Sequence, residues 1–153
     1  MNYATRTLSL DITKLPFNAF IGMQRAQSKD ALLQLPSDPR YLNHLGTVHA
    51  SALLALAEAS SGEFLFRHFG SSEGIVPVVR RLESKFRKPV NGSVTSTATA
   101  TPEALARLTT ELASKGRAII LVAVELHDQS GTHALSATVE WFIQRRPAND
   151  ANA

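Results

Sequence analysis

Three polar residues around one small-residue segment have the types and spacing of a catalytic group. Asn43 comes first, His49 follows six residues later, and Glu58 lies nine residues beyond the histidine. A carboxylate can act as a base or nucleophile, and an amide can hold a water molecule. The residues after His49 are mostly Ala and Leu, so we expect Glu58 to sit inside an apolar helix. Burial there would raise its pKa toward neutrality, which suits a base at pH 7.

Helical geometry separates two of these residues within one chain. Nine residues at about 100° each amount to about 900°, so His49 and Glu58 would face opposite ways on a single helix. A single chain is therefore not expected to assemble the site alone. One helix face instead carries a stripe of small or polar side chains that would let a ligand or a second backbone approach: Thr47, Ser51, Ala55, Glu58 and Gly62.

The element that positions these residues is a long helix. Residues 47–69 are rich in Ala and Leu and contain no Pro, and Gly70 is a natural stop signal. Before it, residues 15–20 predict a short helical turn. Residues 20–26 and 31–35 predict two short strands joined by a polar connection.

The second half of the chain alternates in the manner of strands. Residues 75–88 predict a long strand, and Asn91-Gly92 predicts a hairpin turn into a strand over residues 94–100. Thr101-Pro102-Glu103 predicts the start of a second helix that ends near Gly116. Residues 118–128 and 132–145 predict a final hairpin.

Consecutive strands joined mostly by short turns favour an antiparallel sheet in an α+β domain. A long helix that is apolar nearly all round must be wrapped by that sheet rather than lie on its surface. A curled antiparallel sheet around one long central helix is the hotdog fold. We expect a single hotdog domain over residues 1–145 and a disordered tail over residues 146–153.

Composition excludes several classes of protein. The chain has 153 residues, a net charge of +3, 44% hydrophobic residues and no Cys. No apolar run is long enough to span a membrane, no signal peptide is recognisable, and no nucleic-acid-binding motif is visible. The five His residues lack metal-ligand spacing. We expect a cytoplasmic protein with no metal site, no cofactor, and neither nucleic acid nor membrane as a partner.

Positive charge is concentrated in one segment, which contains Arg80, Arg81, Lys85, Arg87 and Lys88. Two interpretations stay open. The charges could be a solvated strand edge that discourages aggregation. They could also bind a polyanionic substrate group such as the phosphates of coenzyme A.

The segment from Asn43 to Gly62 resembles the signature of hotdog-fold acyl-CoA thioesterases, in particular the phenylacetate-pathway type. That signature is an Asn, a His-Gly-Gly six residues on, and an Asp or Glu nine residues after the His. This chain keeps both spacings but has Ala50-Ser51 in place of the Gly pair. The run from Arg80 to Gly92 resembles the family's strand that ends in a Phe, basic residues, Pro and Gly.

The resemblance implies hydrolysis of an acyl-CoA or acyl-carrier-protein thioester. Glu58 would be base or nucleophile, Asn43 would hold the water, and His49 would belong to the catalytic group. The Ala50 and Ser51 amides at the helix N-terminus would form the oxyanion hole. In the resembling enzymes such sites lie between two subunits, so we expect an obligate homodimer, alone or within a tetramer.

Two alternatives to a thioesterase remain. Because the Gly pair is altered, the protein could be a non-catalytic hotdog that binds or senses acyl-CoA. A hydratase of the same fold usually pairs an Asp with a His in a different motif, and that pairing is not visible here.

Overall fold

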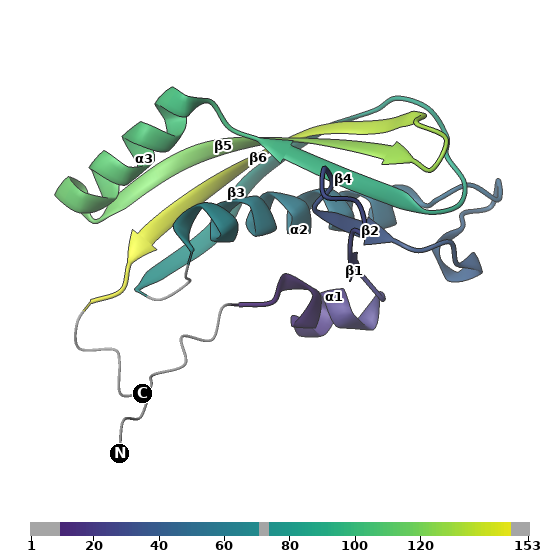
Figure 1. Cartoon of the computed structure of the whole chain (residues 1–153), viewed down its shortest axis with the longest axis horizontal. Helices are drawn as coiled ribbons and strands as arrows, with labels where there is room; N and C mark the ends of the chain where they lie inside the picture. The colour runs from purple at the N-terminus through teal and green to yellow at the C-terminus, as the bar shows by residue number, and fades with distance from the viewer. Residues whose placement is uncertain (1–9, 71–73, 148–153) are drawn as a thin grey trace, which may run out of the picture.

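The computed structural model describes residues 10–70 and 74–147, and its main feature is a curled antiparallel sheet around one helix. Figure 1 shows the sheet arching over the long helix α2, with α1 on the opposite side of that helix. The elements in chain order are η1 (Ile12–Lys14), α1 (Pro16–Phe20), β1 (Gln24–Arg25), β2 (Leu33–Leu35), η2 (Pro39–Tyr41), α2 (Ala50–Phe69), β3 (Ile75–Phe86), β4 (Val94–Thr99), α3 (Pro102–Lys115), β5 (Arg117–Asp128) and β6 (His133–Arg145).

The strands are hydrogen-bonded in the order β1-β2-β4-β5-β6-β3, and each neighbouring pair is antiparallel. Alternate residues of β5 are buried, as a sheet with one face on a core requires. The other face of the core comes from α2, where Leu53, Leu56 and Leu65 are buried. The α+β class and the wrapped central helix are therefore as the sequence predicted.

Local signals set the ends of the two long helices. The side chain of His49 caps the N-terminus of α2, and Gly70 ends it in the left-handed conformation at φ +69°. Thr101 Oγ1 accepts a hydrogen bond of 3.1 Å from the Ala104 amide at the start of α3. The predicted helices are confirmed, although α2 begins three residues later than residue 47.

The predicted hairpin at Asn91-Gly92 is wrong. β3 pairs with β6, and β4 pairs with β2 and β5, so two strands separate β3 from β4 in the sheet. The segment between β3 and β4 is therefore a crossover rather than a tight turn. Val90 in this crossover accepts a 2.9 Å hydrogen bond from the Val48 amide. Long-range pairing of β3 with β6 outweighed the local turn preference.

Near the C-terminus, the Arg146 amide donates a 2.9 Å hydrogen bond to the Gly74 carbonyl, which ties the end of β6 to the start of β3. Of the predicted tail over residues 146–153, positions 148–153 lie outside the described residues. Within the described part of the chain, no helix is both long enough and apolar enough to cross a membrane.

Candidate active site

Asn43 organises the loop that leads into α2. Its Oδ1 accepts hydrogen bonds from the Leu45 and Thr47 amides at 2.9 and 3.1 Å, and its Nδ2 donates to Thr47 Oγ1 at 2.9 Å. Gly46 in this loop has φ +75°, a conformation that favours glycine. The side chain of Asn43 is thus used within its own loop. This arrangement gives the predicted water-holding role no direct support.

His49 lies at the start of α2 and binds its own helix. Its Nδ1 accepts a 3.0 Å hydrogen bond from the Ser51 amide, and its backbone amide donates to the Tyr41 carbonyl at 2.7 Å. A ring nitrogen that accepts such a bond is unprotonated, so the neutral imidazole carries its proton on Nε2. The exposed ring therefore presents an N–H donor to solvent beside the helix N-terminus.

The two amides predicted as an oxyanion hole are not equivalent. The Ser51 amide already has an acceptor in His49. Ala50 is the first residue of α2, and the first amides of a helix have no acceptor within it. The helix N-terminus therefore offers the Ala50 amide and the His49 Nε2–H as its accessible donors, rather than the amides of Ala50 and Ser51.

Glu58 lines an apolar pocket of about 250 Å³. The pocket walls come from α2, from the N-terminal segment and from two residues of the sheet, Pro77 and Trp141. Burial raises the pKa of the Glu58 carboxyl above its ordinary value, because desolvation disfavours the charged form. Within residues 10–70 and 74–147, no cation lies within ion-pair distance of this carboxylate.

The pocket is also lined by Asn18, a polar residue that the sequence analysis did not single out. Asn18 in α1 is buried, and its Nδ2 donates a 3.0 Å hydrogen bond to the Ile12 carbonyl. The aromatic part of the lining is Phe66 and Trp141. Trp141 is fixed by a 2.9 Å hydrogen bond from its Nε1 to Ser61 Oγ. Neither Asn18 nor its neighbours in residues 10–18 shows a catalytic pattern in the sequence.

His49 and Glu58 are not brought together within one chain. Both lie on or next to α2, and nine residues of helix correspond to about 13.5 Å along its axis. The Glu58 pocket and the donors at the helix N-terminus are therefore separate in the single chain, and His49 does not line the pocket.

The basic residues predicted to bind substrate lie on or just after β3, one of the two edge strands of the described sheet. Arg80 and Arg81 lie at a bulge in the pairing of β3 with β6, and both approach Glu140, at 3.9 and 3.7 Å. Arg87 Nε donates to Ser136 Oγ at 3.2 Å. All five of the basic residues are exposed, so the segment remains positively charged surface next to the crossover.

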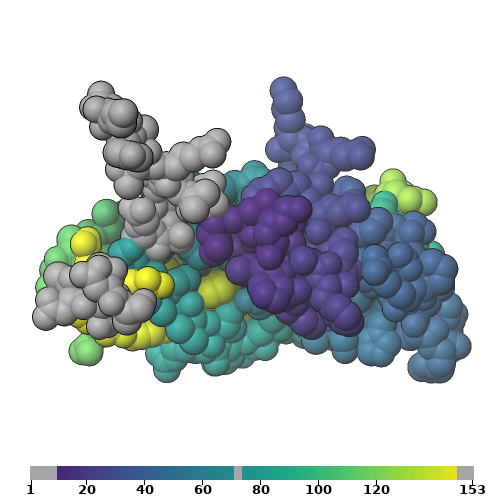
Figure 2. Space-filling view, turned by 90° about the horizontal axis from the view of Figure 1, so that it is seen from below, coloured from purple at the N-terminus to yellow at the C-terminus, as the bar shows by residue number. Residues whose placement is uncertain are grey.

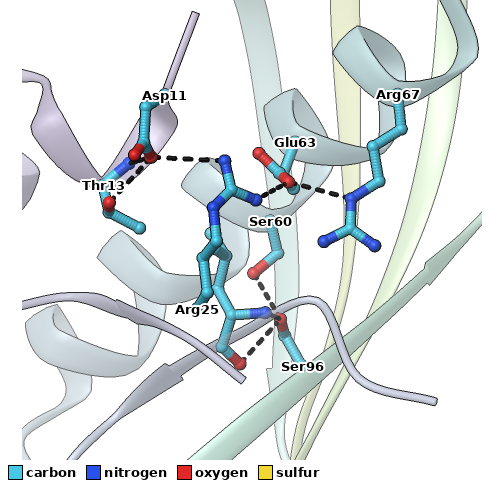
Figure 3. Close-up of polar contacts among 8 residues, drawn as sticks. Asp11, Thr13, Arg25, Ser60, Glu63, Arg67 and Ser96 are labelled. Carbon is cyan, nitrogen blue, oxygen red and sulfur yellow. Dashed lines mark hydrogen bonds and ion pairs between the residues drawn. The ribbon is translucent and has the colours of Figure 1, made fainter. Parts of the chain in front are cut away.

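A second carboxylate of α2, Glu63, is more deeply buried than Glu58. It is 3% exposed and pairs with Arg25 of β1 and, at 2.8 Å, with Arg67. Figure 3 shows both guanidinium groups directed at this carboxylate, with Arg25 also reaching Asp11. Glu63 and Arg67 are four residues apart, a spacing typical of helical ion pairs, and this is the signal in the sequence that points to the pair.

No group of three or more His, Asp or Glu side chains that could hold a metal ion occurs in the described part of the chain. The polar side chains that line the pocket are Glu58 and Asn18.

A family model described as a domain of unknown function, DUF4442, matches residues 12–143. The match spans most of the chain, so this protein belongs to the DUF4442 family. No protein with a curated description matches the sequence.

The chain is similar in structure to a Pseudomonas aeruginosa protein of unknown function described as a probable thioesterase. The two share 23% identity over 92% of this chain and 99% of that chain, with a TM-score of 0.74. A Haemophilus influenzae thioesterase shares 20% identity over 88% and 86% of the two chains, with a TM-score of 0.65. A hypothetical thioesterase from Streptococcus pneumoniae, solved with coenzyme A, shares 18% identity over 82% and 88%, with a TM-score of 0.58. The fold is thus the hotdog fold of thioesterase-superfamily proteins, as the sequence predicted.

Proposed function

We propose that this protein hydrolyses acyl-CoA thioesters to a free carboxylic acid and coenzyme A. The observation that carries the proposal is Glu58. Among the residues that the structure describes, no cation neighbours this carboxylate in its apolar pocket, so it is costly to keep charged and is expected to have a chemical task. The fold supports the assignment, because its structural neighbours include proteins described as thioesterases.

In the proposed reaction the acyl group lies in the Glu58 pocket. Glu58 takes a proton from a water molecule that attacks the thioester carbonyl, or it attacks the carbonyl itself and forms an anhydride that water then hydrolyses. In both routes the carbon–sulfur bond breaks, and coenzyme A leaves as the thiol with a proton that comes from water. The oxygen of the thioester gains negative charge as the carbonyl carbon becomes tetrahedral. The Ala50 amide and the positive end of the α2 dipole stabilise that charge, and His49 Nε2–H supplies a second donor.

The donors come from one subunit and Glu58 from another in this proposal. The unpaired edge of the sheet supports a second copy of the chain as the partner. β3 is twelve residues long and, among the described strands, pairs with β6 alone. It exposes Val76, Val78 and Phe86, and a long exposed edge with apolar side chains favours pairing with another strand. We therefore propose a homodimer through β3, alone or within a tetramer.

The exposed basic residues of the β3 region support a phosphate-bearing leaving group, since coenzyme A and carrier-protein phosphopantetheine both carry phosphate. Two of the structural neighbours were solved with coenzyme A. We also propose that the protein is cytoplasmic and needs no cofactor. The thioester is carried by coenzyme A or, as the alternative, by an acyl-carrier protein.

A thiol-release assay over short, medium, long and aromatic acyl-CoAs tests the reaction. Wild type should turn over at least one of them, and Glu58→Gln should lose about a hundredfold or more in kcat, as expected for removal of a general base. Glu103→Gln is the matched control, because Glu103 is exposed on α3. Turnover that survives Glu58→Gln would rule out the mechanism.

A second function, binding of acyl-CoA without hydrolysis, is favoured by one observation. The Ser51 amide is engaged by His49, so the oxyanion hole has one backbone donor fewer than the predicted pair. Saturable acyl-CoA binding by wild type, with no thiol release at any acyl length, would favour this function over the thioesterase.

A further inference from the structure

The N-terminal segment forms one wall of the pocket that contains Glu58. Leu10, Ile12, Leu15 and Asn18 line it opposite the face of α2 that carries Glu58, Ala59 and Gly62. The residues that form this wall lie outside the sheet. In Figure 2 the segment, drawn in purple, lies across the middle of the face opposite the sheet. The position of this segment therefore sets the width of the pocket.

Polar contacts hold that wall in place at its start. Asp11 Oδ1 accepts hydrogen bonds from the Thr13 amide and hydroxyl, at 3.0 and 2.7 Å, which fixes the 3-10 turn η1. The same Asp11 oxygen lies 3.2 Å from Arg25 Nη2. The other end of the Arg25 guanidinium binds Glu63 of α2 (Figure 3). Arg25 thus connects the pocket wall to the helix that carries Glu58.

The two arginines on Glu63 have different structural consequences. Arg67 lies on α2 itself, so its bond with Glu63 joins two residues of one helix. Arg25 comes from β1 and joins α2 to the N-terminal wall. The hydrogen bond to Glu63 raises the pKa of Arg25, so the guanidinium stays charged throughout the working range of the protein.

We propose that Arg25 is a specificity-determining residue, which clamps the N-terminal wall against α2 and limits the acyl group that the pocket accepts. The proposal rests on the proposed function only in taking an acyl thioester as the ligand. A cavity of about 150 Å³ holds benzene, so the pocket of about 250 Å³, which opens to solvent, can surround about ten non-hydrogen atoms. The substrate class is therefore medium-chain or single-ring aromatic acyl groups, and the part of a longer chain beyond that size stays in solvent while the clamp is closed.

The test measures acyl-CoA binding in a form of the protein that does not turn over. Calorimetric Kd values for acetyl-, hexanoyl-, octanoyl-, phenylacetyl-, dodecanoyl- and palmitoyl-CoA are measured on Glu58→Gln and on Glu58→Gln with Arg25→Met. With Arg25 present, affinity should rise by about fourfold per buried methylene and level off near ten non-hydrogen atoms. With Arg25→Met the rise should continue to dodecanoyl- and palmitoyl-CoA, so the preferred length shifts upward.

Arg67→Met in the same background is the matched control. It also removes one partner of Glu63 but does not touch the N-terminal wall. It should leave the order of acyl preference unchanged, even where it lowers thermal stability as much as Arg25→Met does. Arg25→Lys keeps a cation at the same place and should restore the wild-type preference in part. If Arg25→Met does not fold, Asp11→Ala opens the outer end of the same link and should shift the preference in the same direction.

Two results would overturn the clamp. Equal weakening of all acyl lengths by Arg25→Met would show a general structural role, and an equal length shift in Arg67→Met would show that the wall is not involved. These results differ from a failure of the thioesterase proposal, in which length-selective binding persists while wild type releases no thiol.

Discussion

The backbone amide of Ser51 donates a 3.0 Å hydrogen bond to Nδ1 of His49 across the first turn of α2. This one contact gives His49 two tasks. It satisfies an amide at the helix end that has no acceptor within the helix, and it leaves the other ring nitrogen as a donor beside that end. The proposed oxyanion hole therefore consists of the Ala50 amide and the His49 ring.

The two tasks of His49 can be separated by substitution. Asn is a good N-cap residue, so His49→Asn should keep the free energy of unfolding within about 0.5 kcal/mol, whereas His49→Ala should lose about 1 kcal/mol. Both variants should lower kcat by about tenfold or more, because both lack the ring donor. Urea unfolding and the thiol-release assay measure the two effects. Wild-type kcat in His49→Asn would limit His49 to capping.

Activity should depend on the raised pKa of Glu58. A base works in its charged form, so kcat/KM should rise with pH through an apparent pKa above about 4.3, the ordinary value for glutamate. A pH–rate profile with a good acyl-CoA substrate measures this. A midpoint at or below the ordinary value would contradict the assignment of Glu58 as the desolvated base.

Glu58 should also make the free energy of unfolding depend on pH. Its contribution should fall as pH rises, whereas kcat/KM should rise. Between the ordinary and the raised pKa the folded protein binds more protons than the unfolded chain, so this group's contribution to the unfolding free energy falls as pH rises through that interval. Above the interval Glu58→Gln should be more stable than wild type, because each tenfold difference in proton affinity between the folded and unfolded states corresponds to about 1.4 kcal/mol. Below it the difference should vanish. Urea unfolding of both proteins at several pH values tests this, and a destabilised Glu58→Gln at high pH would contradict it.

Trp141 should report on occupation of the pocket. It is the one tryptophan of the sequence and lines the pocket with Glu58. Titration of Glu58→Gln with octanoyl-CoA should therefore change the intrinsic fluorescence, whereas coenzyme A without an acyl group should change it little. Equal fluorescence responses to octanoyl-CoA and to free coenzyme A would place the acyl group elsewhere.

The hydrogen bond that fixes Trp141 should contribute to stability. Ser61→Ala removes the acceptor of the Trp141 Nε1–H and should cost about 1–3 kcal/mol of stability, because the indole is buried.

The edge of the sheet should control assembly. Val78 is 52% exposed on β3, so Val78→Lys should hardly change the stability of a single chain but should weaken pairing of β3 with a second copy. Leu121 is 48% exposed on β5, which lies inside the sheet, and Leu121→Lys is the control that should leave the dimer intact. Sedimentation velocity over a range of concentrations measures both. A wild-type monomer at micromolar concentration would contradict the two-subunit site.

The sequence by itself determined the elements whose signals are local. α2 ends at Gly70 and α3 begins after Thr101, because a glycine in the left-handed conformation and a hydroxyl N-cap act over a few residues. The spacing of His49 and Glu58 also predicted their separation along α2, since helical rise and phase are fixed properties of the backbone. The site roles inferred from that spacing stay predictions.

The tertiary structure decided what depends on contacts between distant residues. Asn91-Gly92 has the local chemistry of a hairpin, but the partner of β3 is β6, and strand pairing over that separation is not encoded in any short motif. In the same way, only the fold shows that Asn18 and Trp141 border the pocket of Glu58, and that Arg25 reaches Glu63 from β1. The pocket is built by packing among segments far apart in the chain, whereas the spacing of residues on one helix describes that helix alone.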